Sequence, residues 1–231
     1  MNSNTTHGEE DGDVTVEQTG LRARRKQRTR DALVRAALEL FTAQGYERTT
    51  VDEIAEAVEV SQRTFFRYFA SKEEAAFAVQ DVMESHYLAA LRDRPPHEAP
   101  FEAMGNAVFA SWDTIEEAIS DIVPVELHWR SYLVIESTPT LLAVLMRRSA
   151  ESEEVMARLI AEREGLDVDR DPRPRVAVAA FGGVMRAAGR LWGQGDDPRA
   201  EAIRALMETY IAQLGPALAE DWRRSPARPA D

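Results

Sequence analysis

The sequence predicts an all-α protein, in which an N-terminal three-helix module with a helix-turn-helix precedes a larger C-terminal helical bundle. Apolar residues recur at intervals of three and four along most of the chain, which is the spacing of one buried helix face. Gly, Pro, Ser and Thr residues interrupt these stretches where helices start and stop, and no stretch alternates clearly between polar and apolar residues. The predicted segments are a tail at 1–20, the first module at 21–72, the bundle at 73–217 and a second tail at 218–231.

The composition argues against several classes of protein. The chain has no Cys, so disulfides, thiolate zinc sites and cysteine nucleophiles are excluded. No apolar run is long enough to span a bilayer, and the N-terminus lacks the pattern of a secretory signal. Phosphate-binding and dinucleotide-binding glycine motifs and a Ser-His-Asp signature are missing as well, and the four His residues are scattered. We therefore expect a cytoplasmic protein that is not an enzyme and uses no cofactor, metal or membrane.

Charge is distributed unevenly along the chain. The formal net charge of −12 argues against nucleic acid as a partner. However, residues 1–20 hold five Asp or Glu and no Lys or Arg, which is typical of a disordered acidic tail. Residues 21–72 hold eleven Lys or Arg against seven Asp or Glu. Six of these cations fall within nine positions beginning at Arg22, among them Arg24 and Arg28, which suits a phosphate-contacting arm or a solvated helix face.

The first two helices are marked by their end signals. Apolar spacing predicts a helix from about Arg24 to Gln44, and Gly45 is a typical stop. A second helix is predicted to begin at Thr50. Its hydroxyl can accept from a free backbone N–H, and Glu53 can reach back to the cap, which together form a capping box.

A third, short helix follows after Ser61, which can cap it. Phe65 and Phe69 lie four residues apart and are expected to anchor this helix in the core. Side chains on the opposite face can then read base edges, because Gln matches adenine, Arg matches guanine, and a Thr or aromatic group meets a thymine methyl. The outward side chains are expected to be Gln62, Arg63, Thr64, Arg67 and Tyr68.

The stretch from Thr49 to Glu74, TTVDEIAEAVEVSQRTFFRYFASKEE, resembles the helix-turn-helix and fourth-helix start of the TetR family of transcriptional regulators. The resemblance implies a module that binds double-stranded operator DNA. It implies base contacts by residues at Gln62, Arg63, Thr64, Phe66 and Arg67. It implies phosphate contacts by residues at Thr50, Tyr68 and Lys72.

Three positions depart from the family pattern. Glu59 stands where the family has Gly in the inter-helix turn, so either a left-handed backbone is strained there or the turn adjusts. Phe66 replaces Tyr and cannot donate a hydroxyl to phosphate. Arg63 replaces a small residue, so different base preferences are expected. For Phe66 and Tyr68, core packing and DNA contact remain equal alternatives from the residues alone.

The C-terminal bundle is predicted from its breaks. Pro95 follows the fourth helix, Pro124 separates the fifth from the sixth, and Pro139 begins a seventh helix that stops at Gly165. The expected helices cover about 75–87, 101–119, 125–136, 139–164, 176–185 and 203–214, with Gly215 and Pro216 ending the last one.

The last two helices are candidates for subunit contact. Residues 176–185 are almost continuously apolar or small, so more than one face is expected to be buried. The resemblance implies that these helices pair across a two-fold axis in a homodimer, whereas an intramolecular core is the alternative. The candidate interface residues are Ala180, Gly183, Val184, Ala187, Leu206 and Tyr210.

An effector pocket is expected among helices five to eight, which carry many large apolar side chains. Plain core packing is the alternative for each of them, and His128 is more often a satisfied core histidine than a ligand contact. The apolar bias favours a hydrophobic or aromatic effector, and the acidic composition of the region also admits a cationic one. The candidate lining residues are Met104, Phe109, Trp112, Glu126, Trp129, Tyr132, Met146 and Phe181.

Together these features predict a ligand-responsive DNA-binding transcriptional regulator. The expected activity is repression, relieved when a small apolar or aromatic effector releases the protein from a palindromic operator. The alternative is a helical small-molecule-binding or interaction protein that keeps the helix-turn-helix shape without operator binding.

Overall fold

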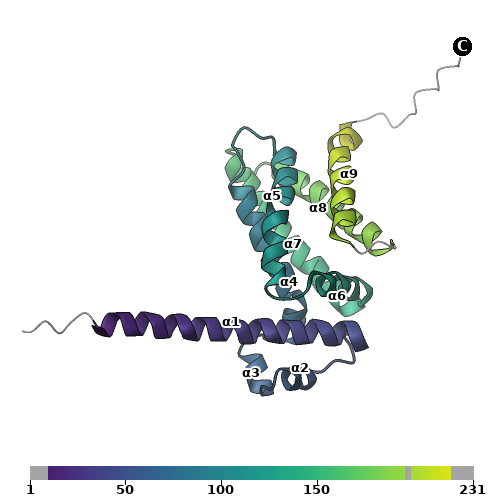
Figure 1. Cartoon of the computed structure of the whole chain (residues 1–231). Coiled ribbons are helices and arrows are strands. Elements are labelled where there is room, and N and C mark those ends of the chain that lie inside the picture. Colours follow the sequence, from purple (N-terminus) through teal and green to yellow (C-terminus); the bar gives the residue numbers. More distant parts are fainter. Residues whose placement is uncertain (1–9, 196–198, 220–231) are drawn as a thin grey trace, which may run out of the picture. The chain divides into compact units, whose positions relative to one another are not determined.

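The structure, a computed structural model, describes residues 10–195 and 199–219. Within these two ranges every regular element is a helix, which confirms the all-α prediction (Figure 1). The helices are α1 (Glu10–Gln44), α2 (Val51–Ala57), α3 (Gln62–Phe66), α4 (Lys72–Arg92), α5 (Pro100–Ser120), α6 (Val125–Ser137), α7 (Pro139–Arg163), α8 (Arg173–Gly193) and α9 (Ala200–Ala219).

The chain divides into two compact units, the first ending at Ala78 and the second beginning at Val79. This boundary lies six residues beyond the predicted one at residue 72. It falls inside α4, which is continuous from Lys72 to Arg92 and therefore belongs to both units.

The first unit is built on the C-terminal part of α1. There α2 packs against α1 and α3 packs against α2, as Figure 1 shows. Phe65 and Phe69 are buried, which confirms their predicted anchoring role, and their rings lie 5.5 Å apart. Buried side chains from all three helices meet in this core: Leu33, Val34, Ala37, Leu38, Phe41, Ile54, Ala55 and Phe65.

The N-terminal part of α1 differs from the predicted acidic tail at 1–20. Residues 10–20 are helical, so α1 begins fourteen residues before the predicted start at Arg24. Extending an existing helix adds one hydrogen bond per residue without a new nucleation cost, and no Pro interrupts this segment. Residues 1–9 lie outside the described part of the chain.

The second unit is a bundle in which α8 packs against α7 and α9, and α6 packs against α7. Its core takes side chains from five helices, α4, α5, α7, α8 and α9. We call this the main core, and its members are Leu91, Ala103, Met104, Ala107, Val108, Met156, Ala157, Ile160, Val178, Phe181 and Leu214. None of the described helices is long and apolar enough to cross a membrane.

Arg163 fixes the connection between α4 and α5. Its side chain is 10% exposed and donates hydrogen bonds to the carbonyl oxygens of Arg94 (2.9 Å), Pro95 and Glu98 (3.0 Å). The carboxylate of Glu98 in turn accepts from Arg94 and from Asn106. Carbonyls in a loop lack the regular N–H partners of a helix, so the guanidinium at the end of α7 supplies donors to them, in addition to the Glu98 N–H that meets the Pro95 carbonyl.

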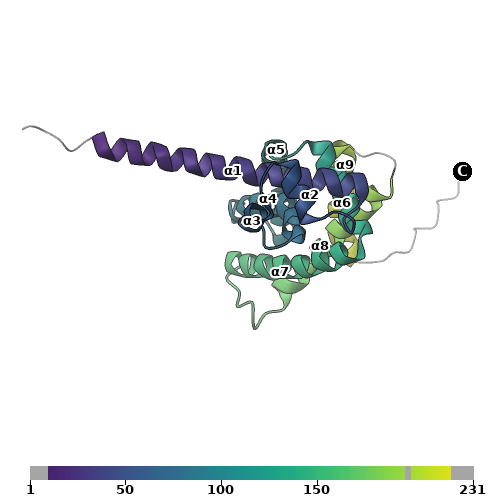
Figure 2. The same ribbon diagram turned by 90° about the horizontal axis from the view of Figure 1, so that it is seen from below.

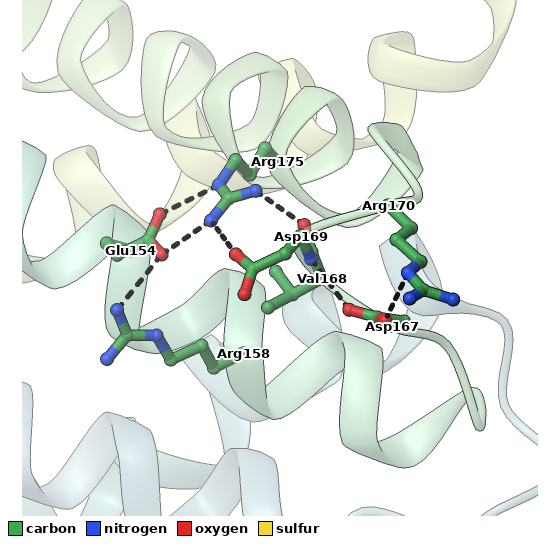
Figure 3. A network of polar contacts seen from close by, with 7 residues as sticks. All are labelled: Glu154, Arg158, Asp167, Val168, Asp169, Arg170 and Arg175. Carbon is green, nitrogen blue, oxygen red and sulfur yellow. Dashed lines mark hydrogen bonds and ion pairs between the residues drawn. The ribbon is translucent and has the colours of Figure 1, made fainter.

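A surface network holds the connection between α7 and α8, the loop visible in Figure 2. Arg175 donates two hydrogen bonds to the carboxylate of Glu154, at 2.9 and 2.8 Å, and others to Asp169 and to the Val168 carbonyl (Figure 3). The hydrogen bonds from Arg175 lower the pKa of Glu154 below its ordinary value. The guanidinium therefore joins the start of α8 to α7 and to the loop between them.

The end of α9 also differs from the prediction that Gly215 and Pro216 stop the helix. α9 continues through Pro216 to Ala219. Pro216 lies in the last turn, where its missing N–H removes only the single hydrogen bond to the carbonyl of Ala212. The predicted tail at 218–231 thus begins inside α9, and its residues 220–231 lie outside the described part of the chain.

Candidate nucleic-acid interface and effector site

The short helix α3 presents a polar face to solvent. Gln62, Arg63 and Arg67 are exposed, while Thr64 and Tyr68 are half-buried. Phe66 is 50% exposed and its ring meets the buried Phe65 ring edge-on at 5.6 Å. Gln62, Arg63 and Arg67 of the five side chains predicted to point outwards are thus exposed, whereas Thr64 and Tyr68 are only partly so. Half of the Phe66 ring remains free for an apolar contact.

Two of these side chains hold each other. The Arg67 guanidinium lies over the Tyr68 ring, with its carbon 5.1 Å from the ring centroid, and donates to the Tyr68 hydroxyl at 3.4 Å. Cation–π stacking of this kind restricts a long side chain that would otherwise sample many rotamers. Arg67 is therefore partly ordered in advance on the surface of α3.

The starts of α2 and α3 are capped as the sequence predicted. Thr50 accepts from the Glu53 backbone N–H at 3.2 Å, and Glu53 accepts from the Thr50 backbone N–H at 2.7 Å, which completes the capping box. The hydrogen bonds from the Thr50 backbone and hydroxyl lower the pKa of Glu53. Ser61 accepts from the Thr64 backbone N–H at 3.2 Å. These caps fix the starts of both helices of the helix-turn-helix.

Lys72 takes part in a contact that the sequence did not predict. Its ammonium donates to the carbonyl oxygens of Tyr46 (3.0 Å) and Thr49 (3.1 Å) and lies 4.0 Å from the centre of the Tyr46 ring. The Tyr46 hydroxyl donates to Glu73 at 2.5 Å. An ammonium has three donors, and two of them fix the loop before Thr50.

Glu59 adopts a left-handed backbone with φ at +54°. This is the first of the two alternatives expected for a turn in which Glu replaces Gly. The Val60 N–H donates to the Ala55 carbonyl at 3.0 Å, and the Glu59 N–H donates to the Glu56 carbonyl at 2.9 Å. These two bonds form a Schellman motif with Glu59 at the position where Gly is usual. The turn between α2 and α3 therefore keeps its geometry and bears the strain.

The basic stretch of α1 is accessible. Leu21 and all residues from Arg22 to Arg28 are exposed. Arg24 and Arg28 lie four residues apart and so share one face of the helix. Arg30 differs, because its guanidinium carbon lies 5.2 Å from the centre of the Phe69 ring.

The eight predicted pocket residues separate into three groups. Met104 and Phe181 belong to the main core, and Phe109 and Trp112 pack against it. Glu126 and Met146 are exposed and belong to neither cluster of buried side chains. Trp129 and Tyr132 join a separate aromatic cluster, which we call the indole cluster; its members are His128, Trp129, Tyr132 and Trp192.

The indole cluster joins α6 to α8 through ring contacts. The centroids of Trp129 and Trp192 are 5.0 Å apart, those of His128 and Trp129 are 4.6 Å apart, and those of Tyr132 and Trp192 are 6.4 Å apart. The backbone of α8 also comes close to α6, because a Cβ added at Gly189 would stand 2.7 Å from the Tyr132 hydroxyl oxygen. A side chain at residue 189 would therefore displace Tyr132.

Four buried polar atoms in the indole cluster lack a hydrogen-bond partner among the described residues. They are both ring nitrogens of His128 and the indole nitrogens of Trp129 and Trp192. His128 is 1% exposed, and its burial lowers its pKa to about 4, so its ring is neutral near pH 7. These unpartnered atoms were not predictable from the residue alone, since a buried His is expected to be satisfied.

The candidate dimer residues are all half-buried. Ala180 and Val184 pack against the main core with part of their surface left to solvent. A Cβ added at Gly183 would meet nothing within 4 Å, so the helix surface is open there. Among the residues described, no group of three or more His, Asp or Glu side chains could hold a metal ion.

Two family models match successive parts of the chain. A family model of the bacterial regulatory proteins of the TetR family matches residues 33–79, and a model of the MftR C-terminal domain matches residues 98–219. The first match covers the helix-turn-helix, and the second covers α5 to α9. The two models together span both units of the fold.

Individual relatives cover most of the chain. TcmR of Streptomyces glaucescens, an HTH-type transcriptional regulator, is 48% identical over 205 residues, which are 89% of this chain and 91% of TcmR. MftR of Mycobacterium tuberculosis, whose name assigns it to mycofactocin biosynthesis regulation, is 30% identical over 83% of this chain and 93% of its own. The crystal structure of native NalD from Pseudomonas aeruginosa has a similar fold, with a TM-score of 0.54 at 20% identity over 82% of this chain and 96% of NalD.

Proposed function

This chain belongs to the TetR family of bacterial regulatory proteins, and we propose that it is a homodimeric repressor that leaves a palindromic operator when a small effector binds. It is a ligand-responsive, DNA-binding transcriptional regulator. The observation that carries the proposal is the exposed polar face of α3, held in place by the Ser61 cap and by the buried rings of Phe65 and Phe69.

We assign base contacts to the exposed face of α3. Gln62 and Arg63 stand in its first turn, where their long side chains can reach the major groove ahead of the helix axis. Arg63 supplies a bidentate donor for guanine and Gln62 suits adenine. Phe66 offers its exposed half to a thymine methyl or a sugar. The full set of proposed base-contacting residues is Gln62, Arg63, Thr64, Phe66 and Arg67.

We assign backbone contacts to residues around this face. Thr50, Tyr68 and Lys72 are the proposed phosphate ligands of the helix-turn-helix. Arg24 and Arg28 extend the positively charged surface along one face of α1. Phosphate contacts set affinity and orientation without reading sequence, so their loss is expected to weaken binding to all DNA about equally.

Repression by a homodimer requires two recognition helices about one duplex turn apart. The half-buried faces of α8 and α9 support such a pairing, because the small side chains on α8 allow a partner helix to approach closely and the larger ones on α9 can pack against it. The proposed contact residues are Ala180, Gly183, Val184, Ala187, Leu206 and Tyr210. Sedimentation of a compact monomer at micromolar concentration would remove this role for α8 and α9.

Effector control is proposed to act through α4. This helix begins at Lys72, whose ammonium fixes the loop before α2, and continues into the second unit. There Asp81 forms an ion pair with Arg148 of α7, and Arg163 holds the loop that follows α4. An effector that favours a different arrangement of α7 thus shifts α4 and changes the spacing of the two recognition helices.

Genomic selection tests the DNA-binding part of this proposal. The full-length protein is mixed with sheared genomic DNA, and bound fragments are recovered and sequenced. We expect enrichment of one palindromic site with half-sites about 10 base pairs apart or a multiple of this spacing. Enrichment of no common sequence would overturn operator binding and leave the interaction-protein alternative.

A further inference from the structure

We propose that the indole cluster is the effector-recognition site and that its ligand is a neutral, planar aromatic molecule with carbonyl and hydroxyl oxygens. This inference rests on the proposed function, because it identifies the chemistry of the effector that relieves repression. The site contains Trp129 and Tyr132 from the candidate lining residues, together with His128 and Trp192, and it leaves out the candidates that belong to the main core.

The unpartnered donors carry the argument. The indole nitrogens of Trp129 and Trp192 can only donate, and their atoms are buried. Nearly all buried polar groups in folded proteins have a partner, so several unpartnered ones in a single cluster call for an explanation. A ligand with oxygen acceptors would supply the missing partners in one binding event.

His128 defines the ligand further. A neutral imidazole has one donor and one acceptor, and both of its nitrogens are unpartnered in a ring that is 1% exposed. Together with the two indoles, the cluster presents three donors and one acceptor. A matching ligand therefore needs several acceptor oxygens and one hydroxyl that can donate to the imidazole.

The unpartnered N–H groups favour a neutral ligand with acceptor oxygens over a cation. The Glu136 carboxylate accepts from the Tyr132 hydroxyl at 2.9 Å, so this negative group is already engaged within the protein. An aromatic face attracts a cation, but the buried indole N–H groups present the positive end of a dipole and can be satisfied only by an acceptor. The cationic effector that the acidic composition admitted is therefore not the one this site favours.

The rings determine the shape of the ligand. Trp129 and Trp192 meet at 66°, and Tyr132 and Trp192 meet at 49°. Offset and edge contacts between aromatic rings contribute modestly beyond their buried area, so an inserted aromatic ring can replace them with stacking of similar strength. A flat aromatic molecule can form such ring contacts in turn, whereas an aliphatic chain cannot.

Equilibrium dialysis of the full-length protein tests the proposal with two probes of similar size. Danthron is a neutral three-ring quinone with two hydroxyls, and proflavine is a three-ring cation. We expect danthron to bind one site per chain and proflavine to bind at least tenfold more weakly. No binding of danthron up to its solubility limit, or tighter binding of proflavine, would overturn the assignment.

Three variants locate the site. Trp192→Phe and His128→Phe keep a buried ring but remove the polar nitrogens. Trp192→Phe is expected to weaken danthron binding about fivefold, the effect of one hydrogen bond, and His128→Phe, which removes two nitrogens, is expected to weaken it more than about fivefold. Tyr87→Phe is the matched control, because it removes a buried, unpartnered hydroxyl from a ring that packs against the main core, and its danthron affinity should equal that of the wild type. Equal losses in all three variants, or no loss in the first two, would place the ligand elsewhere.

Failure of this inference is distinguishable from failure of the proposed function. Danthron is also added to the protein bound to its selected operator. Binding without release of the operator would retain the site and refute effector-relieved repression by it. Operator binding that persists in all variants, with no danthron binding, would retain the DNA-binding function and refute the indole cluster as the recognition site.

Discussion

Replacing Glu59 by Gly is predicted to stabilise the helix-turn-helix. Glu59 has φ at +54° in the Schellman motif that ends α2, and a side chain is costly in this conformation. The end of α7 has the same motif with Gly165 at φ +65°, where the Leu166 N–H donates to the Ala161 carbonyl at 2.8 Å. The chain thus contains one motif twice, once with Glu and once with Gly.

The magnitude follows from two opposing effects. A left-handed backbone costs a non-Gly residue about 1–2 kcal/mol. Glycine gains unfolded-state freedom, which costs about 0.4–1 kcal/mol on folding. We therefore expect Glu59→Gly to raise the free energy of unfolding by about 0.5–1 kcal/mol. Gly165→Ala is expected to lower it by a similar amount, because a Cβ at Gly165 meets nothing within 4 Å and only backbone strain changes.

Backbone hydrogen exchange measures both effects separately, since it reports the opening free energy of α2 and of the end of α7 residue by residue. The two substitutions should shift protection in opposite directions, each confined to its own unit. If Glu59→Gly lowers protection in α2 while Gly165→Ala behaves as expected, the strain at Glu59 is not the dominant effect and the reasoning is refuted.

Three further predictions concern stability. Thr50→Ala removes the α2 cap and should lower the free energy of unfolding by about 1 kcal/mol in urea titrations; an unchanged midpoint would show that the cap is dispensable. Arg163→Met removes the side-chain donor of three carbonyls, of which that of Pro95 keeps the Glu98 N–H, and should cost about 1–3 kcal/mol, whereas Arg158→Met, at a side chain 68% exposed, should cost less than about 0.5 kcal/mol. Because burial lowers the folded-state pKa of His128 from 6.5 to about 4, acid protonates the unfolded chain first, so its contribution is present above pH 6.5 and is lost as the pH falls towards 4. Between roughly pH 7 and pH 5, the free energy of unfolding should fall by about 2 kcal/mol more in the wild type than in His128→Phe. If unfolding of the two proteins depended equally on pH, the buried neutral ring would be contradicted.

Features that depend on neighbouring residues were predictable from the sequence. The capping box of Thr50 with Glu53 and the cap at Ser61 each span three residues, so the sequence placed the starts of α2 and α3 correctly. Helix spacing likewise identified Phe65 and Phe69 as core side chains. Local patterns could not, however, decide how far α1 and α9 extend. The free-energy cost of one Pro or one acidic segment is local, whereas the stability that opposes it comes from the whole helix.

Features that join distant residues were not predictable. Lys72 was expected to meet phosphate, but its ammonium also holds carbonyls 26 and 23 residues earlier in the chain. The Trp192 ring on α8 contacts the Trp129 ring on α6, and no spacing rule relates the two residues. The polar atoms of His128 are unpartnered only because of how α6 and α8 pack, so the sequence alone could not separate the indole cluster from the main core.

The central claim is that the exposed face of α3 reads operator DNA. Fluorescence anisotropy with the selected operator fragment tests it most directly by comparing the wild type, Arg63→Ala and the matched control Arg170→Ala, whose side chain is 88% exposed in the second unit. Loss of one bidentate base contact is expected to weaken binding about 5- to 100-fold for Arg63→Ala. Arg170→Ala should bind as the wild type does. Equal affinity of Arg63→Ala and the wild type for the operator would contradict the account.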